Sequence, residues 1–261
     1  MAYTSIILDL GTVCRLTLNR PQLRNAMTPL MGDEIVDAVR IINDCGDARL
    51  VHVRGNGEAF SAGGDFTFIE RGAADSPDEN RITLVNFYRR FLSIRSLRVP
   101  SLAVIHGAAV GAGLGLALAC DLRYAACDAR LALNFTRIGL HPGLATSFLV
   151  PGLIGLDRAA ELFFTGRFVN GEEAAELGLV TAAVPREQLE ALVSERTEQI
   201  LAAAPLAVAQ VKETLSHGVE ARLEEAMARE AAAQSIDFAS DDLAEAIRAF
   251  RERRTPTFRR R

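Results

Sequence analysis

Short apolar runs and helical apolar periods alternate along roughly the first 184 residues. Runs at 5–10 and 13–19 predict two strands, and Gly11 with Thr12 between them indicates a hairpin. A period that puts Ile35, Val39 and Ile42 on one face predicts a helix over 30–43. A second helix is predicted over 82–94, where one face carries Leu84, Phe87, Phe91 and Ile94.

Further strands are predicted at 49–55, 101–107, 120–127 and 129–135, with a glycine-rich turn at 59–66, a loop at 140–143, and helix followed by strand across 170–184. This alternation predicts an α/β core of repeated strand and helix units. The remainder is helical, with Asp241 as a candidate N-cap. We therefore divide the chain into a core, 1–186, and a helical region, 187–261, that folds back over the core or packs on another subunit.

Composition narrows the possible functions. The chain has 261 residues, 49% of them hydrophobic, which suffices for one or two domains with a sizeable core. Its net charge of −4 argues against nucleic-acid binding, although the end of the chain is basic and is either a solvated tail or a local anion site. Four cysteines without a CxxC pair indicate buried thiols of a reduced, cytoplasmic protein. Neither a signal peptide nor a membrane-spanning stretch is expected.

Two glycine-rich turns carry the candidate chemistry: "AFSAGGDF" at 59–66 and "VGAGLG" at 110–115. Each follows a strand and presents small residues where a helix can begin, so that backbone N–H groups lack internal partners. Two such groups converging on one oxygen form an oxyanion hole, whereas the alternative is a pair of ordinary tight turns. A dinucleotide site is disfavoured because the spacing is G-x-G-x-G, with no ribose-binding acid and no Walker lysine after either turn.

Five segments together resemble the crotonase, or enoyl-CoA hydratase/isomerase, superfamily. They are "LTLNRPQLRNAM", "GNGEAFSAGGDF", "PSLAVIHGAAVGAGLGLALACDLRYAA", "GLHPG" and "FASDDLAEAIRAFRERRTPTF". The resemblance implies an α/β spiral of ββα units with a helical C-terminal region that forms trimers or pairs of trimers. It implies an acyl-CoA thioester as substrate, with coenzyme A entering only as part of that thioester, no permanently bound cofactor and no metal.

The resemblance also assigns residues by motif position. The two oxyanion N–H groups fall on Gly64 and on Ala112, where the family usually has glycine. The positions that contact or line the coenzyme A channel are Arg24, Ala26, Ala62, Asp65 and Phe66. A thioester enolate suits such a site because its oxygen carries the charge that the two N–H groups would hold.

The chain departs from the family at both catalytic glutamates. Their positions fall on Gly115, which would leave room where a side chain stands, and on Phe135, preceded by Asn134 instead of proline. His141 could supply acid or base chemistry, or cap its turn. Asp65 could do so too, or serve as a turn or N-cap carboxylate.

A third possible replacement lies between the two glycine turns, where Glu70, Arg71 and Tyr88 have solvated surface as their default interpretation. His106 and Asp121 are interpreted as structural residues.

Four functions stay open. The first is a hydratase or isomerase with a relocated acid or base, and the second is decarboxylation of a malonyl-type ester, which generates its own enolate. The third is hydrolysis, which would need His141 or Asp65 to activate water. The fourth is binding of acyl-CoA without turnover. We favour an acyl-CoA enzyme of the lyase or isomerase type, cytoplasmic and homotrimeric or hexameric, without nucleic-acid or membrane partners.

Overall fold

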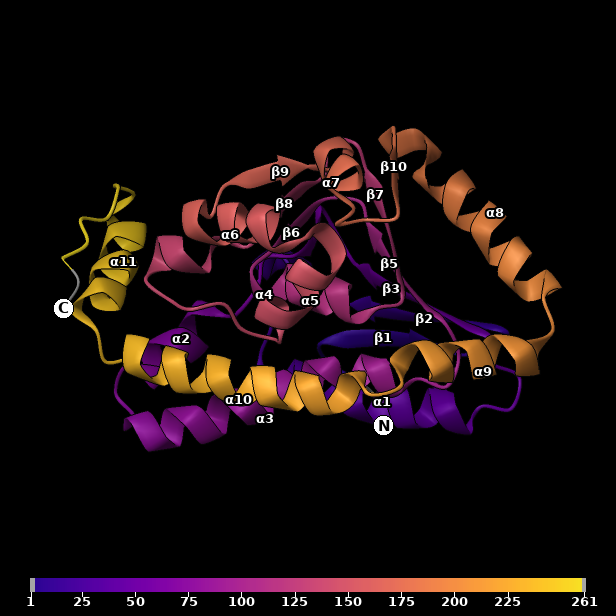
Figure 1. The fold of residues 1–261 in the computed structure, drawn as a ribbon, viewed down its shortest axis with the longest axis horizontal. Helices are drawn as coiled ribbons and strands as arrows, with labels where there is room; N and C mark the ends of the chain where they lie inside the picture. Colours follow the sequence, from indigo (N-terminus) through magenta and orange to yellow (C-terminus); the bar gives the residue numbers. More distant parts are fainter. Residues whose placement is uncertain (1–2, 260–261) are drawn as a thin grey trace.

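The computed structural model describes residues 3–259, which form two sheets surrounded by helices (Figure 1). The larger sheet has the order β1-β2-β3-β5-β7-β10, and its strands span Ile6–Asp9, Val13–Leu18, Leu50–Gly55, Ser101–Ile105, Leu122–Ala126 and Ala182–Val184. The smaller sheet has the order β4-β6-β8-β9, and its strands span Ala59–Ser61, Ala108–Val110, Arg130–Ala132 and Phe168–Asn170. Neighbouring strands are parallel except in the pairs β1–β2 and β8–β9.

From β3 to β8, consecutive strands alternate between the two sheets. β3, β5 and β7 enter the larger sheet, and β4, β6 and β8, which follow them directly, enter the smaller one. A helix or 3-10 helix follows each pair, so the chain repeats a ββα unit. The predicted α/β spiral of such units is confirmed. Because parallel strands end at the same edge of a sheet, this repeat places the C-terminal ends of β4, β6 and β8 next to one another.

The helices pack around these sheets. Their order is α1 (Pro29–Asp44), α2 (Phe66–Gly72), α3 (Pro77–Leu92), α4 (Ala112–Ala119), α5 (Thr146–Ile154), α6 (Leu156–Thr165), α7 (Gly171–Leu177), α8 (Leu189–Ala202), α9 (Pro205–Ser216), α10 (Val219–Asp237) and α11 (Asp241–Glu252). Four 3-10 helices of the described chain are η1 (Pro21–Leu23), η2 (Ser93–Ser96), η3 (Asn134–Ile138) and η4 (Arg186–Gln188). Every residue of α4 is buried, which places this helix in the core.

The predicted helical faces are buried as expected. Ile35, Val39 and Ile42 lie in the core, as do the four apolar residues predicted for the second helix. The hairpin of β1 and β2 also forms. Three strands were not predicted, namely β4 inside the supposed glycine turn, β6 and β9. Each has three residues, which is too short to show a period.

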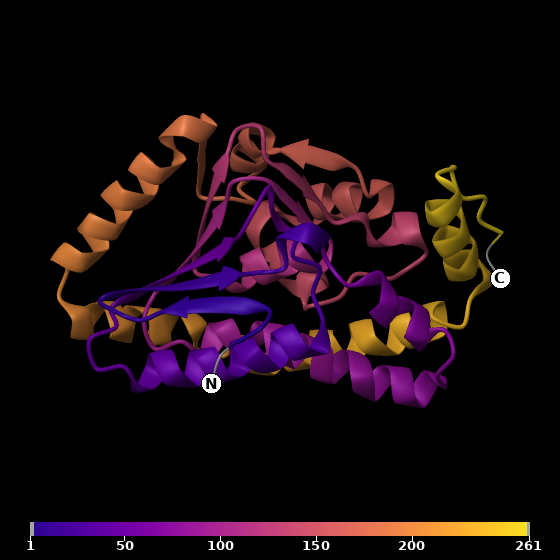
Figure 2. The same ribbon diagram turned by 180° about the vertical axis from the view of Figure 1, so that it is seen from behind.

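The helical region after β10 spans the molecule. α10 runs alongside α3, whereas α8 and α11 lie at opposite ends (Figures 1 and 2). The N-cap of α11 is Ser240, whose side chain accepts from Leu243 N at 3.1 Å; Asp241 is the first helical residue, so that prediction was wrong. Whether residues 187–261 form a separate domain, and whether they build trimers, stays a prediction. Among residues 3–259 no helix is long and apolar enough to cross a membrane.

His52 joins α8 to the larger sheet. Its Nε2 lies 2.9 Å from Thr197 Oγ1, whose own hydrogen is donated to Val193 O at 2.7 Å. Nε2 must therefore carry the ring proton, and the buried Nδ1 has no partner within the described residues. Burial, with the charges of Arg54 and Arg15, lowers the pKa of His52 to about 4.

We predict that His52 makes the fold acid-sensitive. The folded pKa lies below that of an unfolded histidine, so the contribution of neutral His52 is complete above pH 6.5 and is lost as pH falls toward 4. The difference in unfolding free energy between the parent and His52→Gln should shrink over this window, by at most on the order of 3 kcal/mol. Urea unfolding of both proteins at pH 7.5 and 4.5 measures this difference. A difference in unfolding free energy that is the same at both pH values would contradict the prediction.

Candidate functional site

The two glycine-rich turns lie side by side because β4 and β6 pair in parallel. The register joins Ala59 to Ala108 and Ser61 to Ala109. Gly63 follows β4 with a φ of +94°, and a Cβ there would lie 2.7 Å from Val110 O and 3.5 Å from Ala112 N. Glycine is therefore required at this position both for its backbone conformation and for the close approach of the second turn.

Two backbone donors remain available at this junction. Ala112 is the first residue of α4, so its N–H has no acceptor in the helix. Gly64 forms a bridge with Met27, but that bridge uses Gly63 O and Asp65 N. Within residues 3–259 neither the N–H of Gly64 nor that of Ala112 has a hydrogen-bond acceptor. The junction can thus donate two hydrogen bonds to an oxygen of a ligand.

A cavity of about 690 Å³ opens at this junction. It is lined by seven of the eight residues that sequence analysis assigned to the site, namely Arg24, Ala26, Ala62, Gly64, Asp65, Phe66 and Ala112. Ala62 N donates to Arg24 O at 2.8 Å, which ties η1 to the end of β4. Segments from three parts of the chain therefore meet around one space.

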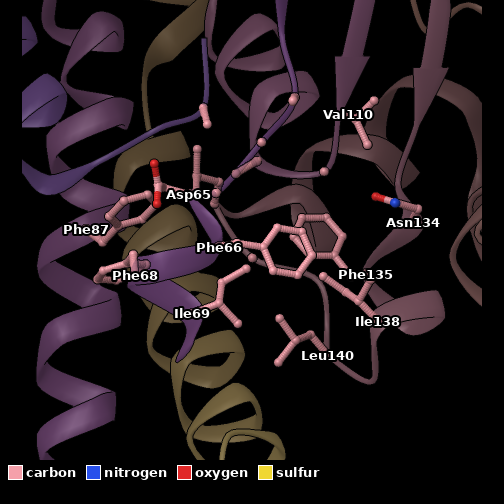
Figure 3. Close-up of a pocket in the computed structure, with 18 of the residues that line it drawn as sticks. Asp65, Phe66, Phe68, Ile69, Phe87, Val110, Asn134, Phe135, Ile138 and Leu140 are labelled. Atoms are coloured by element: carbon pink, nitrogen blue, oxygen red, sulfur yellow. The ribbon is translucent and has the colours of Figure 1, made fainter. Parts of the chain in front are cut away.

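Aromatic side chains dominate the wall of the cavity. Seven of the 13 phenylalanines line it: Phe66, Phe68, Phe87, Phe135, Phe168, Phe238 and Phe250. The rings of Phe66 and Phe250 stack at 4.2 Å, and those of Phe68 and Phe87 at 4.7 Å. In Figure 3, Phe66 and Phe135 point toward one another from α2 and η3. Such a wall favours an apolar ligand group.

The space expected beside Gly115 is filled. A Cβ at Gly115 would lie 3.0 Å from Leu144 Cβ and 3.2 Å from Thr146 Cγ2. The expectation that Gly115 leaves room for a missing side chain was therefore wrong, since Leu144 occupies that side of the cavity. Phe135, at the other glutamate position, lies in the lining and is 7% exposed. The two positions to which the family resemblance assigns glutamates therefore carry no carboxylate, and Leu144 closes the space beside one of them.

A row of polar side chains on α10 holds the loop that carries Leu144. Leu144 and Ala145 adopt left-handed conformations, with φ of 57° and 54°. The carboxylate of Glu230 accepts from Ala145 N at 2.6 Å and from Ser147 N at 2.9 Å. One and two turns further along α10, Gln234 donates to His141 O and Asp237 accepts from His141 N at 2.6 Å.

These α10 residues were missed by sequence analysis. Their only signal is the spacing of Glu230, Gln234 and Asp237 at i, i+4 and i+7 on one face of an alanine-rich helix. That spacing shows a polar face but not the loop that it contacts.

His141 does not line the cavity of Gly64 and Ala112. It lines a second cavity of about 510 Å³, together with Ser147 and Asp237. Its Nδ1 lies 2.8 Å from Pro142 O, which corresponds to the turn-capping alternative. The structure therefore does not bring this side chain together with the two N–H donors.

The other polar candidates have mostly structural contacts. Asp65 caps α2 by accepting from Thr67 N at 3.0 Å, and it pairs with Arg20 at 3.0 Å. Glu70 forms an exposed ion pair with Arg251, and Arg71 is exposed. Tyr88 was expected at the surface, and this was wrong. It is 2% exposed and lines the cavity, because α10 covers its helix.

Two further residues have the structural contacts that were expected of them. His106 Nε2 lies 2.9 Å from Gly57 O. Asp121 accepts from Ser101 N at 2.7 Å and from Lys212 at 2.6 Å. Across residues 3–259, no group of three or more His, Cys, Asp or Glu side chains is placed to hold a metal ion. The site offers backbone donors in a lining that is mainly apolar.

Comparison with known proteins agrees with this architecture. Residues 10–261 match the family model described as "Enoyl-CoA hydratase/isomerase". The chain is 33% identical over 260 residues to a crotonyl-CoA hydratase of Syntrophomonas wolfei, covering 99% of each chain. It is 34% identical over 248 residues to a putative enoyl-CoA hydratase of Thermus thermophilus, covering 95% of this chain and 98% of the relative.

A solved enoyl-CoA hydratase/isomerase from Pseudoalteromonas atlantica superposes with a TM-score of 0.85 at 31% identity, over 98% of this chain and 100% of that one. The chain therefore belongs to the enoyl-CoA hydratase/isomerase family, whose members are acyl-CoA enzymes.

We predict that Gly115→Ala destabilises the protein. The added methyl group would press on Leu144 and Thr146 in a closely packed core, and this overpacking, typically about 1 to 3 kcal/mol, should outweigh the roughly 1 kcal/mol by which alanine is favoured over glycine within a helix. The double variant Gly115→Ala with Leu144→Gly should lose less than the sum of the single variants, because glycine at 144 removes the Cβ that lies 3.0 Å from the added methyl group. Thermal or urea unfolding of the four proteins measures the coupling, and additive losses would show that the two side chains do not compete.

The buried Glu230 carboxyl gives a second stability prediction. Burial raises its pKa to about 7, although the donors from Ser147 and Ala145 oppose the shift. Its folded pKa exceeds that of an unfolded glutamate, so the stability that it contributes is full below pH 4.5 and is lost as pH rises through about 7. Between pH 5 and 8 the parent should therefore lose on the order of 2 kcal/mol relative to Glu230→Gln. Urea unfolding of the two proteins measures this loss. A difference in unfolding free energy that stays constant from pH 5 to pH 8 would contradict the raised pKa of Glu230.

Proposed function

We propose that this protein binds an acyl-CoA thioester with its carbonyl oxygen on the N–H groups of Gly64 and Ala112, and that it acts through the thioester enolate. The observation that carries the proposal is a pair of N–H groups on neighbouring turns that have no acceptor among residues 3–259 and that line an apolar cavity. When the enolate forms, the negative charge moves onto the oxygen. The two donors then bind more strongly than in the ground state, which is the condition for catalysis.

The two ends of the cavity suit the two parts of such a substrate. Arg24, Ala26 and Ala62 would contact the coenzyme A part, with Asp65 and Phe66 beside the thioester. The acyl group would lie among Phe135, Leu144 and their apolar neighbours. Coenzyme A would be present only as part of the substrate.

The lining provides little acid or base chemistry. Among the described residues, Asp65 is the one carboxylate that lines the cavity, and it is held by Arg20 and by the first turn of α2. Reactions that generate an enolate without a protein base, such as decarboxylation, fit this lining better than addition of water to a double bond. The same poverty of acid and base groups makes acyl-CoA binding without turnover the second candidate function.

Replacement of Ala112 by proline tests the proposal. Proline is tolerated at the first position of a helix, so Ala112→Pro removes the N–H with little cost to α4, whereas Ala112→Gly keeps it. If turnover depends on this donor, the proline variant should lose about 10²- to 10³-fold in rate. The glycine variant should stay close to the parent.

Turnover would be followed with a panel of crotonyl-CoA, malonyl-CoA and saturated acyl-CoA esters, by thioester absorbance and by deuterium uptake at the α-carbon. Equal rates for the proline variant and the parent would exclude this oxyanion hole. Tight ester binding by the parent without turnover or deuterium uptake would instead favour the binding function.

A further inference from the structure

Tyr88 and Gln234 place a hydrogen-bonded pair in the otherwise apolar acyl side of the cavity. Tyr88 is 2% and Gln234 4% exposed, and both line the cavity. The hydroxyl of Tyr88 donates to Gln234 Oε1 at 2.8 Å. Neither group is needed to complete the oxyanion hole, and the family glutamates correspond to other positions.

The direction of this hydrogen bond is determined by the neighbouring backbone. His141 O can only accept, so Gln234 must direct its NH₂ group toward it. Its oxygen then faces Tyr88, which must donate its single proton to that oxygen. The remaining capacity of the Tyr88 hydroxyl consists of its lone pairs, so it offers the cavity an acceptor.

Gly143 leaves these polar atoms uncovered. A Cβ at Gly143 would lie 2.8 Å from Tyr88 Oη and 3.0 Å from Gln234 Nε2. Its φ is not in the left-handed region, so a side chain here is opposed by this close approach and not by backbone strain. Gly143 lines the cavity beside Leu144, which packs on Gly115 of α4, the helix whose first N–H is the Ala112 donor. The acceptor therefore lies on the acyl side of the proposed oxyanion hole.

We propose that Tyr88 is a specificity residue that accepts a hydrogen bond from a hydroxyl group on the acyl chain of the substrate. The inference rests on the proposed acyl-CoA function and narrows it to hydroxylated, predominantly apolar acyl groups. A hydroxyl can supply the donor that the Tyr88 oxygen lacks, while the hydrocarbon or aromatic remainder contacts the phenylalanine wall.

The surrounding charges disfavour an acyl carboxylate at the same place. Glu230 and Asp237 lie near Tyr88 and, together with burial as the larger cause, hold its pKa well above the usual range. The charged residues that line the cavity within the described chain are Arg24 and Asp65, on η1 and at the start of α2. The Tyr88 end therefore offers no cation to a carboxylate, and the neutral phenol stays protonated near pH 7.

The test compares matched ligands by calorimetry. The ligands are phenylacetyl-CoA with its 3-hydroxy and 4-hydroxy derivatives, and hexanoyl-CoA with its 6-hydroxy derivative. At least one hydroxylated ester should bind the parent about three- to tenfold more tightly than its unsubstituted form, as expected for one added neutral hydrogen bond. Tyr88→Phe should remove this difference, so that within this variant each hydroxylated ester binds no more tightly than its unsubstituted form.

Two further variants keep the test decisive. Tyr124→Phe removes the hydroxyl of another buried tyrosine that does not line the cavity, and it should retain the preference. Gly143→Ala covers the Tyr88 oxygen and should abolish the preference for hydroxylated esters. This variant supplies the test even if Tyr88→Phe fails to fold.

The proposal is overturned if no hydroxylated ester gains affinity in the parent, or if the gain persists in Tyr88→Phe or in Gly143→Ala. If no ester binds better than free coenzyme A, the proposed acyl-CoA function fails instead.

Discussion

The site depends on the parallel pairing of three short strands, β4, β6 and β8. Parallel strands end at one edge of their sheet, so the turns that follow β4 and β6, and η3 after β8, meet there. Gly63 then allows the first two turns to touch, with Val110 O and Ala112 N against its bare Cα. The pair of N–H donors, the cavity and the position of Phe135 all follow from this arrangement.

The two halves of the site differ in how they respond to changes of side chain. In the proposed site, backbone N–H groups supply the oxyanion donors, so alanine at 112 preserves the donor. Acid and base chemistry needs particular side chains, and this chain has Gly115 and Phe135 where the family resemblance places glutamates. Leu144, held through Ala145 and Ser147 by Glu230, fills the space beside Gly115. Under the proposed function, the protein would therefore combine the oxyanion hole of the family site with an apolar pocket for the acyl group.

Sequence reasoning predicted the long elements and missed three of the five three-residue strands. The helices around Ile35 and Phe87 show several turns of apolar period, whereas β4, β6 and β9 have three residues each. His141 and Tyr88 illustrate a second limit. His141 is close to the site along the chain but lines another cavity, while Tyr88, in a stretch assigned to the surface, lines the site. Proximity in sequence does not determine the side of a loop or helix on which a residue packs.

The sequence by itself determined the fold class, the glycine-rich turns that carry Gly64 and Ala112, and the absence of glutamate at 115 and 135, because these depend on residue identity and local period. Only the tertiary structure decided what replaces the missing side chains. Leu144 reaches Gly115 and Tyr88 reaches the cavity because α10, which begins at Val219, 75 residues after Leu144, packs on α3 and holds the 141–147 loop. Such contacts join segments whose spacing along the chain contains no signal of their meeting.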